Sequence, residues 1–325
     1  MARGGASVWW QSPAPGIYGG WGRVGKEIGA ELRKRGRLAE GPGEGTVQIS
    51  HTQPYPGPGH APTWERRAAI QLIYTMVEGP CPPDWVPIIN GMEGVLTPSR
   101  WSRDILRKAG VEVPIWKAGH GVRTEDFPLL ERDEGRPWTF LWQGTTPKDR
   151  KRGLLVERIF RELALPDAKL VKKWVPFDGS MGGHLTSGAI EDWSAYVPQR
   201  EMLELLARCD VSVNPTMAEG FGLVPLEHAA TGMLPMVTSG TGCDEYLRPR
   251  DLRACCAYQI ESTPHEDGAQ RLANRDHLAE LMRWTYENQD EARRMGRHAA
   301  EVVRTYWTWS RVADQVEGAV EEATR

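Results

Sequence analysis

The chain has 325 residues, of which 40% are hydrophobic and 26% are charged, and its formal net charge is −3. This composition is typical of a soluble globular protein, and the length predicts two domains of ordinary size. No stretch reaches the roughly 18 apolar residues that a membrane-spanning helix needs, and the apolar run near the N-terminus is too short for a signal peptide. We therefore expect a cytoplasmic protein.

The cysteines and the charge pattern exclude two further classes of site. The five cysteines are odd in number and show neither C-x-x-C nor paired metal-ligand spacing, so we expect buried thiols and neither a disulfide framework nor a zinc site. Basic clusters at 33–37 and 148–152 resemble solvated faces, and the negative net charge gives no overall attraction to nucleic acid.

The first part of the chain alternates predicted strands with predicted helices. An apolar run at 6–12 predicts a strand that ends in a proline and glycine cluster at 13–22. A helix follows at 23–36, where Val24, Ile28 and Leu32 recur at helical spacing. A second helix begins at Ser99 and stops at Gly110. Buried strands are predicted at 45–50, 70–77, 93–99 and 113–122.

The same order returns after a polar, glycine- and proline-containing stretch at 129–138, which predicts a linker. Strands are predicted at 139–144, 168–174, 210–216 and 233–239. Helices are predicted at 152–163, 200–209, 223–232, 274–304 and 307–323. The pattern predicts two α/β domains with doubly wound parallel sheets facing each other across a cleft. We place them at 1–133, with a C-terminal helix at 306–325 crossing back, and at 134–305.

A glycine-rich turn lies between the first predicted strand and its helix. Gly20, Gly22 and Gly25 satisfy the G-x-G-x-x-G pattern of dinucleotide-binding proteins, and an NAD-dependent oxidoreductase is therefore one alternative. That fingerprint also requires an acidic residue about twenty positions later, where Glu40 and Glu44 lie in a glycine-rich loop before the second strand. The glycines equally suit any phosphate that approaches the start of a helix.

The segment AEGFGLVPLE at 218–227 predicts a more specific anion site. If a helix starts near Val224, the amides just before it have no intrahelical partner and can bind a diphosphate. Pro225 suits the first turn, where an N–H is not needed. Glu219 and Glu227 flank the turn, and carboxylates beside a diphosphate should accept hydrogen bonds from hydroxyl groups. Hydroxyls on both sides of a diphosphate describe a sugar nucleotide.

The stretch at 214–247, NPTMAEGFGLVPLEHAATGMLPMVTSGTGCDEYL, resembles the donor-site signature of retaining family-four glycosyltransferases of the GT-B fold, whose hallmark is E-x(7)-E. The resemblance continues in the family's order through TFLWQGTTPKDRKRGLLVERIF, VLTPSRWSRDILRKAGVEVPIWKAGHGV and YGGWGRVGKEIGAELRKRG. It therefore covers most of the chain and includes the final helix with WTWSRVA.

The resemblance assigns roles to particular residues. Glu227 would hold the ribose hydroxyls, and Glu219 the hydroxyls of the transferred sugar. The amides of Phe221, Gly222, Leu223 and Val224 would bind the distal phosphate. Arg152, with Lys151 beside it, would neutralise the diphosphate, although a solvated helix start is the alternative for both. Gly19 and Gly20 match the first-domain glycine pair that approaches the donor phosphate.

Three positions depart from the family's pattern. Thr145 follows Gly144 where the family often has an arginine, so that phosphate-binding arginine is absent or is replaced from elsewhere. The stretch IYTMVEG stands where many members have a histidine, which makes Glu78 a candidate for orienting acceptor or donor sugar, or else a structural carboxylate. His120 resembles the family's interdomain HGVD step, with Arg123 in place of the acid. His228 is expected to be a core or surface residue.

We expect a retaining, metal-independent hexosyltransferase that uses a UDP- or GDP-sugar and no cofactor. The acceptor would be a glycan, a lipid-linked sugar or a hydroxylated base in DNA, selected by loops such as 51–67. A non-catalytic sugar-nucleotide-binding module is the second alternative, because it would keep the same pocket without turnover.

Overall fold

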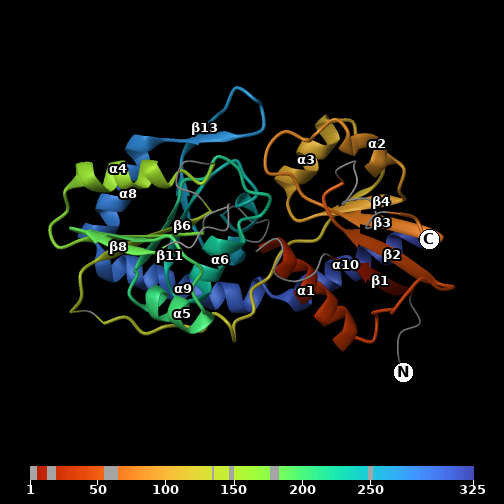
Figure 1. Cartoon of the computed structure of the whole chain (residues 1–325), viewed down its shortest axis with the longest axis horizontal. Coiled ribbons are helices and arrows are strands. Elements are labelled where there is room, and N and C mark those ends of the chain that lie inside the picture. The colour runs from red at the N-terminus through yellow and green to blue at the C-terminus, as the bar shows by residue number, and fades with distance from the viewer. Residues whose placement is uncertain are drawn as a thin grey trace. The chain divides into compact units, whose positions relative to one another are not determined.

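The computed structural model describes residues 6–12, 20–54, 65–133, 135–145, 150–175, 183–247 and 252–325. The chain forms two compact units, which are described separately (Figure 1). Unit 1 comprises residues 1–121 and 308–325, and unit 2 comprises residues 122–307. The division lies between Gly121 and Val122, whereas the sequence placed it after residue 133. In the described part of the chain, no helix combines the length and the apolar character needed to cross a membrane.

Unit 1 is built on a five-stranded parallel sheet with the order β1-β2-β3-β4-β5. Its strands are β1 (Ser7–Gln11), β2 (Thr46–His51), β3 (Ile70–Tyr74), β4 (Gly94–Thr97) and β5 (Ile115–Lys117). Its helices are α1 (Gly20–Lys34), α2 (Trp85–Asn90), α3 (Arg100–Lys108) and α10 (Trp309–Ala323). Figure 1 shows α1 and α10 on one face of the sheet and α2 and α3 on the other.

The predicted helix signals of unit 1 have direct structural counterparts. Val24, Ile28 and Leu32 form the buried side of α1. The hydroxyl of Ser99 accepts a hydrogen bond from the amide of Ser102 at 3.1 Å, so Ser99 caps α3 as expected.

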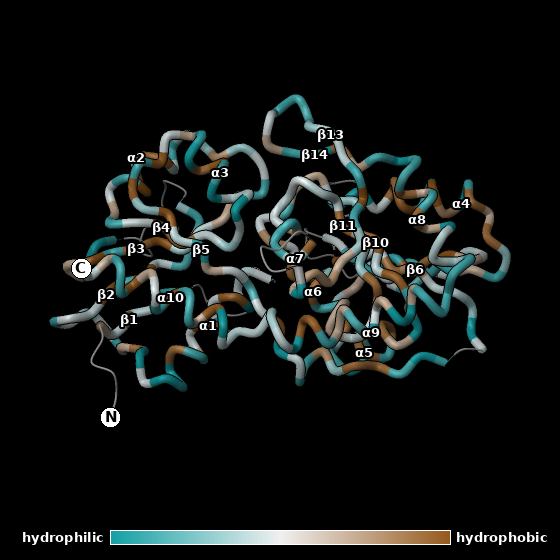
Figure 2. Tube along the Cα trace, turned by 180° about the vertical axis from the view of Figure 1, so that it is seen from behind, coloured by the Kyte–Doolittle hydropathy of each residue, from teal (hydrophilic) through white to brown (hydrophobic). Residues whose placement is uncertain are grey.

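Unit 2 contains a seven-stranded sheet with the order β12-β11-β10-β6-β7-β9-β8. Its strands are β6 (Thr139–Gly144), β7 (Lys169–Trp174), β8 (His184–Ser187), β9 (Ile190–Trp193), β10 (Val211–Asn214), β11 (Leu234–Thr238) and β12 (Tyr258–Ile260). All neighbours are parallel except β8, which pairs antiparallel with β9 at the edge. The central strands β10 and β11 are buried along their whole length because helices cover both faces of the sheet (Figure 2).

The side chains of β6 show how this sheet is covered. Phe140 and Trp142 pack into one apolar cluster with α4, while Leu141 packs into another with α6 and α9. The helices of unit 2 are α4 (Gly153–Leu163), α5 (Gln199–Ala207), α6 (Leu223–Ala230), α7 (Asp244–Leu247), α8 (Arg275–Glu287) and α9 (Gln289–Tyr306). A 3-10 turn (Leu252–Ala254) and a hairpin of β13 (Ser262–Pro264) and β14 (Arg271–Ala273) complete it.

Two sequence expectations need correction. The single helix expected at 274–304 is two helices, because Asn288 leaves the helical conformation at φ −123° and ψ 51°. The stretch at 129–138 was expected to be a linker, but its described part is bound to unit 2.

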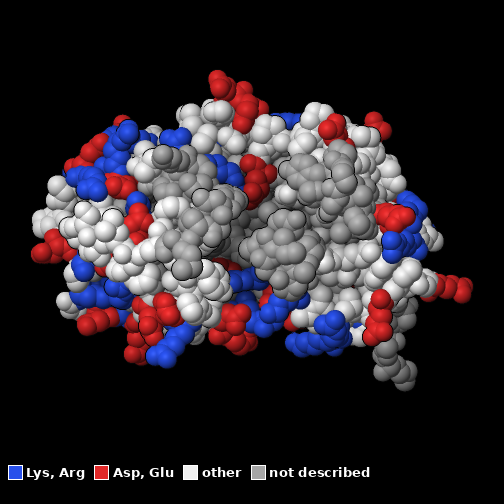
Figure 3. Space-filling view, viewed as in Figure 1, with Lys and Arg blue, Asp and Glu red and all other residues white. Residues whose placement is uncertain are grey.

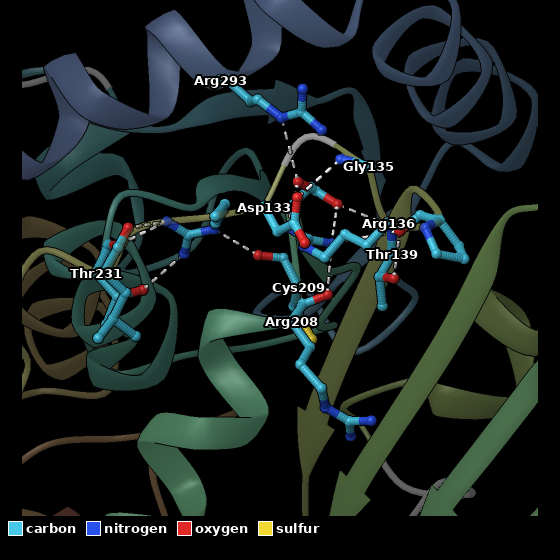
Figure 4. A network of polar contacts seen from close by, with 12 residues as sticks. Asp133, Gly135, Arg136, Thr139, Arg208, Cys209, Thr231 and Arg293 are labelled. Carbon is cyan, nitrogen blue, oxygen red and sulfur yellow. Dashed lines mark hydrogen bonds and ion pairs between the residues drawn. The ribbon is translucent and has the colours of Figure 1, made fainter.

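This stretch belongs to a network of polar contacts, in which Figure 4 labels Asp133, Gly135, Arg136 and Arg293. Arg136 donates to both Asp210 oxygens at 2.7 and 2.8 Å, and Arg293 approaches the same carboxylate at 3.6 Å. Arg132 donates to the backbone oxygens of Cys209 and Thr231 at 2.7 and 2.8 Å. These bonds explain why the division between the units lies before the stretch.

Candidate functional site

The turn before α6 has the geometry expected of an anion site. Gly222 caps the helix with φ +89°, a left-handed conformation that favours glycine. A Cβ at this position would lie 2.5 Å from the hydroxyl of Tyr246 and 2.6 Å from the sulfur of Cys243. The helix begins at Leu223, where the predicted helix at 223–232 also begins, so the amides of Gly222, Leu223 and Val224 have no intrahelical acceptor.

Phe221 contributes to this turn through its backbone, because its ring belongs to the core. The ring is buried and makes edge contacts with Tyr246 and Trp307 at centroid distances of 5.8 and 6.0 Å. The Tyr246 hydroxyl donates to the carbonyl of Gly222 at 2.9 Å. The ring contacts of Phe221 and the hydrogen bond from Tyr246 therefore hold the turn in place.

Both predicted carboxylates flank the turn and are almost fully buried. Glu219 is 6% exposed and Glu227, within α6, is 7% exposed. Lys151 bonds directly to the Glu219 carboxylate, and Arg150 lies 3.7 Å from it. Burial opposes ionisation of Glu219, but the charges of Lys151 and Arg150 outweigh it and hold the pKa of this carboxyl below its ordinary value.

The structure distinguishes among the three basic residues before α4. Lys151 pairs with Glu219, whereas Arg152 adopts a left-handed conformation with φ +60° and donates to the sulfur of Met217 at 3.6 Å. Arg150 donates to the carbonyl of Ala218. Arg150 was not predicted as a site residue, although it lies inside the basic cluster at 148–152, because such a pattern resembles a solvated face.

His228 is a core residue whose two ring nitrogens are both bonded. The side-chain oxygen of Gln143 can only accept, so Nε2 of the neutral ring carries the proton and donates to it at 2.9 Å. Nδ1 then accepts from the Ser212 hydroxyl at 2.6 Å, and that hydroxyl accepts from the Asn214 amide at 2.8 Å. Burial and the charge of Arg132 lower the pKa of His228 to about 3. This neutral ring ties α6 to β10 and β6.

The remaining candidates belong to unit 1. Gly20 is the first residue of α1, and Gly19 lies outside the described residues. Glu78 is half-buried in the loop after β3. His120 is buried beside Trp309, at a centroid distance of 6.1 Å, and burial lowers its pKa to about 3. Of the predicted site residues, Lys151, Glu219 and Gly222 therefore lie close together within unit 2.

Packing explains one glycine of the pattern at the start of α1. A Cβ on Gly25 would lie 1.8 Å from the hydroxyl of Ser12 and 2.7 Å from Nδ1 of His51, so glycine allows α1 to approach the sheet. Strand β2 ends at His51, where a dinucleotide-binding protein would place an acid.

A comparison with known protein families matches the segment that contains this turn. Residues 194–316 match the family described as Family 4 Glycosyltransferase in conflict systems, and this segment contains Glu219 and Glu227. The resemblance to family-four glycosyltransferases is confirmed there. No curated protein sequence matches the chain.

Solved glycosyltransferases share the fold. A glycosyltransferase from Rickettsia africae is 12% identical with a TM-score of 0.69, and the match covers 99% of this chain and 100% of that one. HepE from Anabaena, solved with UDP and glucose, is 11% identical with a TM-score of 0.65, covering 98% and 99%. Sucrose-phosphate synthase from Thermosynechococcus elongatus is 13% identical with a TM-score of 0.62, covering 94% and 79%. The expected α/β fold of GT-B type is confirmed.

Proposed function

We propose that this protein, a glycosyltransferase of the family-four, GT-B type, catalyses the retaining transfer of a hexose from a UDP- or GDP-sugar to a hydroxyl acceptor. The observation that carries this proposal is the glycine-capped start of α6 between two buried carboxylates, Glu219 and Glu227. Unpaired amides suit the diphosphate, and the carboxylates suit sugar and ribose hydroxyls. The neighbour solved with UDP and glucose supports a nucleotide-sugar donor.

The proposed reaction relies on charge stabilisation and positioning. The bond between the anomeric carbon and the diphosphate breaks, and a bond to the acceptor oxygen forms on the same face of the sugar. The acceptor proton passes to a phosphate oxygen of the leaving nucleoside diphosphate. Lys151 and Arg150 would stabilise the charge that develops on that group, and no metal ion or cofactor takes part in this scheme.

The acceptor is proposed only by class: a glycan or lipid-linked sugar, or a hydroxylated base in DNA. Over the described residues of the face in Figure 3, basic and acidic side chains are interspersed. A nucleic-acid surface would more typically gather Lys and Arg, and this mixed pattern favours a sugar acceptor. All five cysteines are free thiols, which supports the proposed cytoplasmic location.

A thermal-shift screen of nucleoside diphosphates and their sugars tests the donor, because a ligand that binds the folded state raises the melting temperature. We expect UDP or GDP, and the matching sugar, to stabilise the protein, whereas stabilisation by NAD alone would favour an oxidoreductase. Release of nucleoside diphosphate with an acceptor separates an enzyme from a binding module. The anomeric configuration of the product, measured by NMR with and without a chelator, tests retention and metal independence.

A further inference from the structure

The β13–β14 hairpin of unit 2 was not predicted from the sequence, and it brings a basic residue next to the candidate donor site. Figures 1 and 2 show the hairpin projecting from the unit, with its turn directed away from the sheet. Arg271 is the first residue of β14 and pairs with Pro264 next to the turn of the hairpin.

The backbone of Arg271 is bonded to the segment that leads into Glu219. Its amide donates to the carbonyl of Met217 at 2.7 Å, and the amide of Met217 donates to the carbonyl of Arg150 at 2.8 Å. Met217 therefore lies between the hairpin and the loop that supplies Arg150 and Lys151. The side chains of these three basic residues start from adjoining backbone segments.

The guanidinium of Arg271 is held in place by neutral groups. Nε donates to the Ser262 hydroxyl at 3.0 Å, and one terminal nitrogen donates to the Ser262 carbonyl at 2.9 Å. Gly240, with φ +77°, packs against this guanidinium, because a Cβ there would lie 2.7 Å from Nε. No carboxylate among the described residues lies within ion-pair distance of Arg271. A half-buried, oriented guanidinium without a carboxylate partner is suited to an external anion.

The loop that contacts Arg271 also contacts the predicted donor residues. The amide of Gly242 donates to the carbonyl of Glu219 at 2.8 Å, and a Cβ on Gly242 would lie 2.4 Å from the carbonyls of Glu219 and Gly220. The amide of Gly240 is bound by the carboxylate of Asp244 at 3.1 Å. The loop thus joins Arg271 on one side to the E-x(7)-E turn on the other.

Four basic residues contact the segment 217–219, which leads into the turn before α6, through their side chains or backbone. The four basic residues are Arg150, Lys151, Arg152 and Arg271. Basic residues from two separate backbone segments therefore adjoin the predicted donor turn.

We propose that Arg271 binds the diphosphate of the nucleotide sugar and supplies from the hairpin the guanidinium that Thr145 does not provide. This inference rests on the proposed function and adds a residue to its donor site. The fork of the guanidinium can donate to phosphate oxygens while Ser262 keeps its orientation.

The test compares Arg271→Gln and Arg271→Lys with Arg275→Gln as a surface control. Arg275 is the first residue of α8 and pairs with Glu162 of α4 and Asp276 of α8. Affinities are measured by calorimetry for UDP, GDP, their nucleosides and inorganic pyrophosphate. We expect Arg271→Gln to weaken diphosphate and pyrophosphate binding about 10- to 100-fold and nucleoside binding little, because hydrogen bonds to charged groups contribute that much. Arg271→Lys should lose less, and Arg275→Gln should match the wild type.

Several outcomes would overturn the inference. One is unchanged diphosphate and pyrophosphate affinity in Arg271→Gln, and another is an equal loss for nucleosides, which would indicate distortion of the unit. Weakened binding of UDP-glucuronate with unchanged binding of UDP and UDP-glucose would assign Arg271 to a sugar carboxylate instead. If the wild type binds neither UDP nor GDP, the proposed function fails; pyrophosphate then decides whether Arg271 binds an anion.

Discussion

Substituting Gly222 by alanine tests the turn before α6 most sharply. The backbone at φ +89° should cost about 1–2 kcal/mol for a residue with a side chain. The new methyl group would also lie 2.5 Å from the Tyr246 hydroxyl and 2.6 Å from the Cys243 sulfur, both fully buried. Overpacking of this kind adds about 1–3 kcal/mol. We therefore expect Gly222→Ala to lose about 2–5 kcal/mol of unfolding free energy.

Gly188 provides the matched control. It has a positive φ of +60° and no described atom within 4 Å of the position that a methyl group would take, so Gly188→Ala should show only the backbone cost. Denaturant unfolding followed by tryptophan fluorescence gives both values. In the Gly222→Ala background, Tyr246→Phe removes the crowded hydroxyl and should recover part of the loss. Equal stability of Gly222→Ala and Gly188→Ala would refute the close packing of this turn.

Three further predictions concern buried polar groups. Lys151→Met should cost about 3 kcal/mol of unfolding free energy at neutral pH, since Arg150 remains beside Glu219. Because the pKa of Glu219 is depressed, the stability that its carboxylate contributes is lost as pH falls through the folded pKa. Wild type and variant should therefore converge in acidic unfolding titrations, and a pH-independent difference would contradict this. Gln143→Leu removes the acceptor of His228 Nε2 and should cost about 1–3 kcal/mol. Because the pKa of His228 is about 3 in the folded state and near 6.5 in the unfolded state, its contribution to stability is present above pH 6.5 and declines toward pH 3. NMR should show a neutral ring with the proton on Nε2 at pH 7, and a charged ring there would refute the assignment. Asp210→Asn leaves Arg136 and Arg293 without their carboxylate and should cost about 3–5 kcal/mol in denaturant unfolding, whereas a loss below 1 kcal/mol would refute its central role.

The sequence predicted those elements whose signal is local. The apolar run at 139–144 matches β6 because strands buried on both faces are continuously apolar. Helix α2 was missed because it is only 6 residues long and contains Pro87, which the first turn of a helix tolerates. The β13–β14 hairpin is polar and largely exposed, so it lacks the hydrophobic alternation that predicts strands.

In the candidate site, too, only the features with a local sequence signal could be predicted. Glycine and carboxylate spacing predicted the turn and its acids, because both depend on a few consecutive residues. The pairing of Lys151 with Glu219 could not be predicted, because the left-handed backbone at Arg152 redirects the loop and decides which basic side chain meets the carboxylate. Arg271 reaches Met217 through a contact between residues far apart in the chain, which no local pattern encodes.

A crystal structure with bound UDP-sugar or GDP-sugar would show whether the turn before α6 binds the donor. We expect phosphate oxygens within hydrogen-bonding distance of the Leu223 and Val224 amides, ribose hydroxyls on Glu227 and sugar hydroxyls on Glu219. A nucleotide sugar bound elsewhere, with this turn filled by the protein's own side chains, would contradict it.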